Sequence, residues 1–87
     1  MGQYEKLLLA LMSGTKDRDV RFSDLRLILD RLGFDCRVRG DHFIYTRDGV
    51  DEIINVQPNG SKAKPYQCKQ VRQLVLKYDL GGALNEI

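Results

Sequence analysis

The residue in this sequence best suited to acid–base chemistry is His42, the single histidine of the 87-residue chain. It follows Gly40 and Asp41 and precedes an apolar run. An unperturbed imidazole titrates near pH ~6.5, so near neutral pH it can take a proton from a ribose hydroxyl or return one to a leaving oxygen. His42 is therefore a candidate general acid or base. The alternative is that it has no role in chemistry, as is the case for most single histidines.

A second feature that could do chemistry is a basic segment. Residues 58–77 contain no Asp or Glu, but they contain five basic residues, Lys62, Lys64, Lys69, Arg72 and Lys77. Residues 60–70 read as a flexible loop that leads into a helix N-terminus, where free backbone N–H groups and two lysines could hold a phosphate. On that helix, Lys69 and Arg72 are expected to face solvent and reach the same anion. The pattern favours a polyanionic partner, with an ordinary solvated surface as the alternative.

Length and composition exclude several other functions. A chain of this length forms one domain, residues 1–87, with little room for a buried cofactor. Its two cysteines form no Cys-x-x-Cys pair, and acidic pairs such as Asp17 and Asp19 are expected to be solvated loop residues, so no metal site or cofactor is predicted. The apolar run near the N-terminus is too short to span a bilayer and lacks the features of a leader peptide. We therefore expect a cytoplasmic protein without membrane contact.

Three segments have the apolar spacing of amphipathic helices. Apolar residues recur at i, i+3, i+4 and i+7, which predicts helices over residues 1–14, 23–33 and 65–78. Ser23 is a suitable N-cap for the second helix, and Gly33 is suited to the position just after its end. The residues after position 78 are expected to form a tail.

Between the second and third helices the apolar period changes to that of strands. Residues 35–40, 42–47 and 50–57 are rich in β-branched and aromatic side chains, and Asp48 and Gly49 are typical of a tight hairpin turn. The sequence thus predicts an α+β domain in which one face of a three-stranded antiparallel sheet carries the second and third helices. The first helix is an addition at the N-terminus.

The order and spacing of three stretches resemble the HicA toxins of bacterial and archaeal toxin–antitoxin modules. These stretches are Leu-Gly-Phe at residues 32–34, Gly-Asp-His at residues 40–42 and the basic segment at residues 62–71. In the HicA family a helix ends at the first motif, a Gly-Ser-His or Gly-Thr-His begins the second strand, and a basic loop opens the last helix. The resemblance covers residues 22–78, and the helix before it looks like one added in some members.

The resemblance implies a double-stranded-RNA-binding-like fold of order α-β-β-β-α. It also implies a ribosome-independent endoribonuclease, or mRNA interferase, that cleaves mRNA without a metal ion and arrests growth. A HicB-like antitoxin protein is implied as the partner that covers the active site. We accordingly expect a monomer when the protein is free and a hetero-oligomer with the antitoxin.

The essential histidine of the family corresponds to His42. It would act as general base or acid while a ribose 2′-hydroxyl attacks the adjacent phosphate, and Arg39 or Lys62 would stabilise charge on the phosphorane. The residues expected to bind RNA are Arg39, Gly40, Lys62, Lys64, Lys69 and Arg72. The second proton-transfer group is left open between water, Tyr45, Tyr66 and a lysine.

Asp41 departs from the family pattern, which has a small hydroxyl residue at this position, and Phe43 replaces a second histidine found in many members. Because an ionised aspartate repels a phosphate, reduced activity is expected. Asp41 thus favours one alternative, a module that binds RNA without cutting it. A second alternative is a protein that docks a partner, since Leu27 and Leu76 fall on otherwise polar helix faces. For Leu27, burial beneath the first helix is the preferred explanation.

Overall fold

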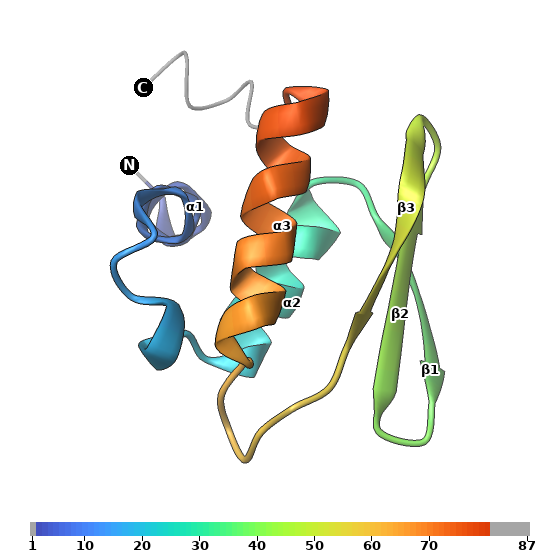
Figure 1. Cartoon of the computed structure of the whole chain (residues 1–87), viewed down its shortest axis with the longest axis horizontal. Helices are drawn as coiled ribbons and strands as arrows, with labels where there is room; N and C mark the ends of the chain where they lie inside the picture. The colour runs from blue at the N-terminus through green and yellow to red at the C-terminus, as the bar shows by residue number, and fades with distance from the viewer. Residues whose placement is uncertain (1, 81–87) are drawn as a thin grey trace.

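The computed structural model describes residues 2–80 of the protein. These residues form a three-stranded antiparallel sheet with its helices on one side (Figure 1). The elements in chain order are α1 (Gln3–Ser13), a 3-10 helix η1 (Asp17–Asp19), α2 (Phe22–Arg31), β1 (Asp35–Arg39), β2 (His42–Arg47), β3 (Val50–Val56) and α3 (Pro65–Tyr78). The strand order is β1-β2-β3. The predicted α+β class, the three helices and the antiparallel meander are confirmed. Most of the predicted tail lies outside the described residues.

The tight turn between β1 and β2 sets the start of the second strand. Arg39 pairs with His42, so only Gly40 and Asp41 connect the two strands. The φ angle of Gly40 is 62°, and a positive φ at the first of two connecting residues is what a type II′ hairpin turn requires. A glycine adopts this angle at little cost, so the Gly-Asp-His sequence puts the histidine at the first position of β2.

Alternate side chains of the sheet point toward the helices and form the core. Tyr45 of β2 and Ile54 and Val56 of β3 are fully buried there. The phenol oxygen of Tyr45 accepts a hydrogen bond from Nε of Arg26 at 3.0 Å, and burial raises the pKa of Tyr45 to about 12. Tyr45 therefore belongs to the core, and the hypothesis that it is the second proton-transfer group is wrong.

The helices form two further layers behind the sheet. In Figure 1, α2 and α3 lie between the sheet and α1, and Leu8 and Leu11 of α1 are buried among the core residues.

The two leucines on otherwise polar helix faces differ in their environment. Leu27 is half-buried, whereas Leu76 is 69% exposed on α3. Within residues 2–80, no helix combines the length and the apolar composition needed to cross a bilayer.

The basic loop before α3 is more ordered than the sequence suggested. Its backbone is hydrogen-bonded to the segment before α2, because N–H of Ala63 donates to the carbonyl of Val20 and N–H of Phe22 donates to that of Ser61, both at 2.9 Å. The loop is therefore attached to the rest of the fold through its backbone. The same contacts explain why α2 begins at Phe22 rather than after Ser23, the predicted N-cap.

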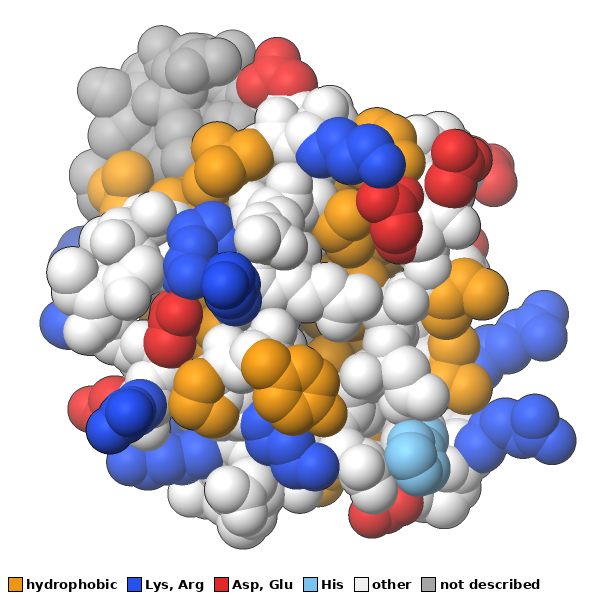
Figure 2. All heavy atoms as spheres, viewed as in Figure 1, with side chains coloured by type: hydrophobic (Ala, Val, Ile, Leu, Met, Phe, Trp, Pro, Cys, Tyr) orange, Lys and Arg blue, Asp and Glu red, His pale blue; other side chains and the backbone are white. Residues whose placement is uncertain are grey.

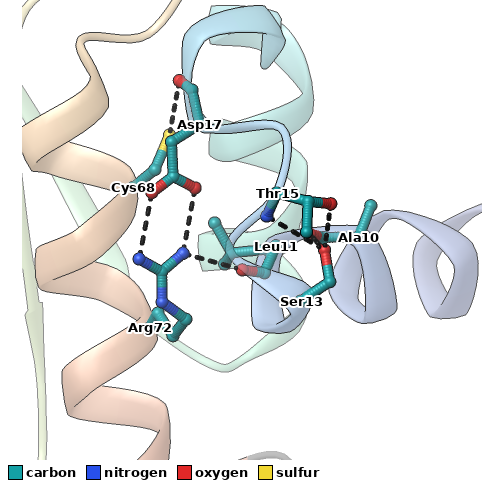
Figure 3. Close-up of polar contacts among 7 residues, drawn as sticks. All are labelled: Ala10, Leu11, Ser13, Thr15, Asp17, Cys68 and Arg72. Atoms are coloured by element: carbon teal, nitrogen blue, oxygen red, sulfur yellow. Dashed lines mark hydrogen bonds and ion pairs between the residues drawn. The ribbon is translucent and has the colours of Figure 1, made fainter.

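An ion pair between Asp17 and Arg72 connects the segment after α1 to α3 (Figure 3). Two guanidinium nitrogens of Arg72 donate to the two carboxylate oxygens of Asp17 at 2.9 Å, and one of them also donates to the carbonyl of Leu11 at 3.0 Å. The side chains of Arg72 and Asp17 are only 17% and 20% exposed. The expectations that Arg72 faces solvent to bind RNA and that Asp17 is merely solvated are both wrong, because the two residues satisfy each other.

This ion pair should contribute measurably to stability. We expect Arg72→Ala to lower the free energy of unfolding by about 2 kcal/mol, because it leaves a poorly hydrated carboxylate and a carbonyl without their donor. Urea denaturation of Arg72→Ala, Asp17→Ala and the double variant gives the coupling energy directly. The matched control is Lys62→Ala, which breaks the exposed Lys62–Asp19 pair of the neighbouring segment and should leave stability nearly unchanged. Equal effects in both pairs would contradict the structural role of Arg72.

Candidate functional site

His42 lies on the face of the sheet that points away from the helices. Successive side chains of a strand point to opposite faces, and its neighbour Phe43 packs against the core together with Tyr45. The side chain of His42 is 46% exposed. Figure 2 shows the histidine at the surface, next to an acidic side chain and near basic side chains that project from the side of the molecule where the sheet lies. A dissolved substrate can therefore reach the imidazole.

One ring nitrogen of His42 is bonded to the neighbouring strand. Its Nδ1 lies 3.1 Å from the side-chain oxygen Oδ1 of Asn55 in β3. A carbonyl oxygen can only accept a hydrogen bond, so Nδ1 carries the proton in this arrangement. The neutral imidazole then has its lone pair on Nε2. Asn55 thereby orients the ring and selects the tautomer in which Nε2 can accept a proton.

The other ring nitrogen lies near a carboxylate that is itself held in place. Nε2 of His42 is 3.7 Å from Oδ1 of Asp41, and Oδ2 of Asp41 accepts a hydrogen bond from Nε2 of Gln57 at 2.9 Å. That hydrogen bond from Gln57 lowers the pKa of Asp41 below its ordinary value. Asp41 is thus ionised at neutral pH and fixed beside the imidazole.

Gln57 also connects this group to α3. Its Oε1 accepts a hydrogen bond from Nζ of Lys64 at 3.5 Å, and Lys64 is the residue that caps the N-terminus of α3. Polar contacts therefore run from Lys64 through Gln57 and Asp41 to His42. The candidate site is the group formed by these four residues and Asn55. Its members come from β2, from β3, from the residues next to these strands and from the N-cap of α3.

This arrangement supports proton transfer at Nε2. The lone pair is free to take a proton, and the imidazolium that forms is stabilised by the charge of Asp41 at 3.7 Å. The same charge opposes the approach of a phosphate to the ring. The site therefore combines a positioned base with an electrostatic obstacle to an anionic substrate.

Three of the residues predicted to bind RNA lie at this site. Arg39 pairs with His42 across the β1–β2 hairpin, so its side chain belongs to the same face of the sheet. Gly40 forms the turn between the two strands. Lys64 reaches the site through its contact with Gln57.

The other three predicted residues lie elsewhere. Nζ of Lys62 forms an ion pair with Asp19 at 2.7 Å, and Arg72 is occupied by Asp17. Lys69 is exposed on α3. Within residues 2–80, none of these three makes a hydrogen bond or ion pair with the candidate site. The electrostatic contribution of the site is therefore carried by Arg39 and Lys64.

Asn55 and Gln57 were not recognised in the sequence, although a signal for them existed. Arg47 pairs with Val50 across the second hairpin, and continued regular pairing would put Asn55 directly opposite His42. An irregularity between Tyr45 and Arg47 shifts the register by two residues, so that Ile44 pairs with Asn55 instead. A shift of two residues keeps every side chain on its face. Alternation alone thus predicts that Asn55 shares a face with His42.

Among residues 2–80, no three His, Cys, Asp or Glu side chains come together as a set that could hold a metal ion. Comparison of the chain with models of protein families, with curated proteins and with solved structures gave no match. The function is therefore inferred from the geometry of the site and from the resemblance of residues 22–78.

The bond between His42 and Asn55 gives a prediction that does not depend on the function. At pH ~8.5, where an ordinary imidazole is neutral, His42 should carry its proton on Nδ1, and Asn55→Ala should shift the tautomer toward protonated Nε2. Two-bond ¹H–¹⁵N correlation spectra of histidine-labelled protein distinguish the two forms. The control is Asn59→Ala, which removes an exposed amide in the loop before α3. A tautomer that Asn55→Ala leaves unchanged would show that this bond does not orient the ring.

Proposed function

We propose that this protein is a HicA-like toxin, a metal-independent and ribosome-independent endoribonuclease that cleaves mRNA with His42 as acid or base. The observation that carries the proposal is the geometry of this one histidine. It is a half-exposed imidazole whose Nδ1 lies 3.1 Å from Oδ1 of Asn55, which leaves the lone pair on Nε2, the nitrogen 3.7 Å from the carboxylate of Asp41. The Gly-Asp-His motif and the basic segment that resemble the HicA family meet in this same site through the contact between Lys64 and Gln57.

The reaction begins when Nε2 of His42 takes the proton from a ribose 2′-hydroxyl. The 2′-oxygen attacks the adjacent phosphorus, and the bond from phosphorus to the 5′-oxygen of the next nucleotide breaks. That leaving oxygen receives a proton from the imidazolium or from water. The additional negative charge of the phosphorane is stabilised by Arg39, which pairs with His42, and by Lys64, which contacts Gln57.

The proposal includes the setting in which the enzyme works. Residues 22–78 form a double-stranded-RNA-binding-like core to which α1 is added, and the protein is cytoplasmic. A HicB-like antitoxin covers the active site, so the free monomer becomes part of a hetero-oligomer. Support for such a partner comes from Ile53, which is 62% exposed and lies on the same strand as Asn55, beside the site that the partner has to cover.

Replacement of His42 tests the catalytic role. We expect His42→Ala to abolish cleavage of a labelled single-stranded RNA in the presence of EDTA, and to abolish growth arrest, because His42 is the base that the proposed reaction uses. The matched control is Thr46→Ala, an exposed change on the same strand that should retain full activity. Circular dichroism of both variants verifies the fold. Cleavage by a folded His42→Ala variant would refute the assignment.

A second candidate is a module that binds RNA without cleaving it. The observation that favours it is Asp41, whose carboxylate is ionised, held by Gln57 and only 3.7 Å from Nε2 of His42. A scissile phosphate that approaches Nε2 meets this negative charge. In this case RNA binds through Arg39 and Lys64 but is not cleaved.

Variants of Asp41 separate the two candidates. If the charge is only an obstacle, Asp41→Ser and the nearly isosteric Asp41→Asn should both cleave RNA several-fold faster than the wild type in single-turnover experiments. An increase in Asp41→Ser alone would indicate that the family's hydroxyl donates to the phosphate. A decrease in both variants would show that Asp41 assists His42. No cleavage by the wild type or by either variant would favour the binding module.

A further inference from the structure

Tyr66 differs from the other six aromatic side chains of the protein. All six of these are buried in the core or packed against it, and three of the rings also meet a cation, those of Tyr4, Phe43 and Tyr78. Phe43, for example, packs on the ring of Phe22 and beneath the guanidinium of Arg26. Tyr66 is 62% exposed, and within residues 2–80 its ring and hydroxyl have no partner. Its ring is therefore available to a molecule outside the chain.

The backbone under Tyr66 is fixed. Tyr66 is the second residue of α3, after Pro65, and the next two residues, Gln67 and Cys68, are fully buried. The side-chain oxygen of Gln67 accepts a hydrogen bond from the backbone N–H of Lys64, which closes the first turn. An exposed ring on so well anchored a turn presents a flat apolar surface at a defined place and loses little freedom when it binds.

The surroundings of Tyr66 are basic. Lys64 comes two residues before it, and Lys69 is three residues after it and thus on the same side of the helix. Residues 58–77 contain no acidic residue. Figure 2 shows apolar and basic side chains interleaved over the beginning of α3. An aromatic ring between lysines is the combination that binds an unpaired base together with its phosphates.

We infer that Tyr66 is a stacking platform for one unpaired base of a single-stranded RNA whose backbone crosses Lys64 toward His42. This inference rests on the proposed function and names its substrate class, because the bases of a duplex are already stacked on one another and cannot lie on a protein ring. The path is short, since Lys64, Gln57, Asp41 and His42 are in successive contact. Tyr66 positions the strand through its ring, and its hydroxyl has no part in the proton transfer.

The inference is tested by equilibrium binding of a short 2′-O-methyl oligonucleotide, which cannot be cleaved because its 2′-oxygen is blocked. Tyr66→Ala should weaken binding of the single strand by about five- to a hundred-fold, the range for loss of one stacked base. Binding of the same strand in a duplex, and of inorganic polyphosphate, should be unchanged. Tyr66→Phe should bind and cleave like the wild type. Leu76→Ala, a matched loss of an exposed apolar side chain on the same helix, should have no effect.

Tyr66→Trp gives a direct readout, since the chain has no other tryptophan. Its fluorescence should be quenched by the single strand and not by polyphosphate. Unchanged affinity of Tyr66→Ala, or an equal loss with polyphosphate, would overturn the stacking role while leaving the proposed ribonuclease intact. A wild type that binds no single-stranded RNA would overturn both. The melting temperature of each variant shows that it is folded.

Discussion

The site depends on one constraint, the alternation of side chains along a sheet that has helices on only one face. Phe43 points into the protein, where its ring meets that of Phe22 with centroids 5.1 Å apart and the guanidinium of Arg26 at 4.5 Å. His42 is its neighbour in the chain and must therefore point outward. A slip of one residue would exchange the two, exposing the aromatic ring and burying the imidazole. The apolar core thus fixes the direction in which the polar side chains of the site point.

Helix α3 connects this site to the rest of the molecule. Its inner side supplies Val71, Leu74 and Val75 to the core between the sheet and the other helices. Lys64 at its N-cap reaches the site through Gln57, and two turns later Arg72 holds the segment that follows α1. Basic residues on one short helix consequently have different roles, and their common charge gives no indication of which role each one has.

The elements of the fold could be predicted from the sequence because each is encoded by local spacing. The bounds of α3, the end of α2 before Gly33 and the tight turn at Asp48 and Gly49 agree with the prediction. The environment of Arg72 could not be predicted, because a helical projection considers one helix alone and Asp17 is far away in the chain. For the candidate site, the sequence predicted His42, Arg39 and Lys64. Asn55 was missed although alternation puts it on the face of His42. What no local pattern encodes is the register irregularity, which makes Asn55 the pair of Ile44 rather than of His42.

The ion pair of Asp17 with Arg72 joins residues that are 55 positions apart in the chain. A ribosome synthesises α1 before α2 and α3, and the buried side chains of α1 find their neighbours only when these two helices follow. The guanidinium that holds the segment after α1 leaves the ribosome after the whole sheet has done so. During synthesis, the strands and the imidazole of His42 therefore emerge before Arg72 can form the ion pair that holds the segment after α1. Although α1 is synthesised before the other described helices, it is among the last of them to be held by its tertiary contacts.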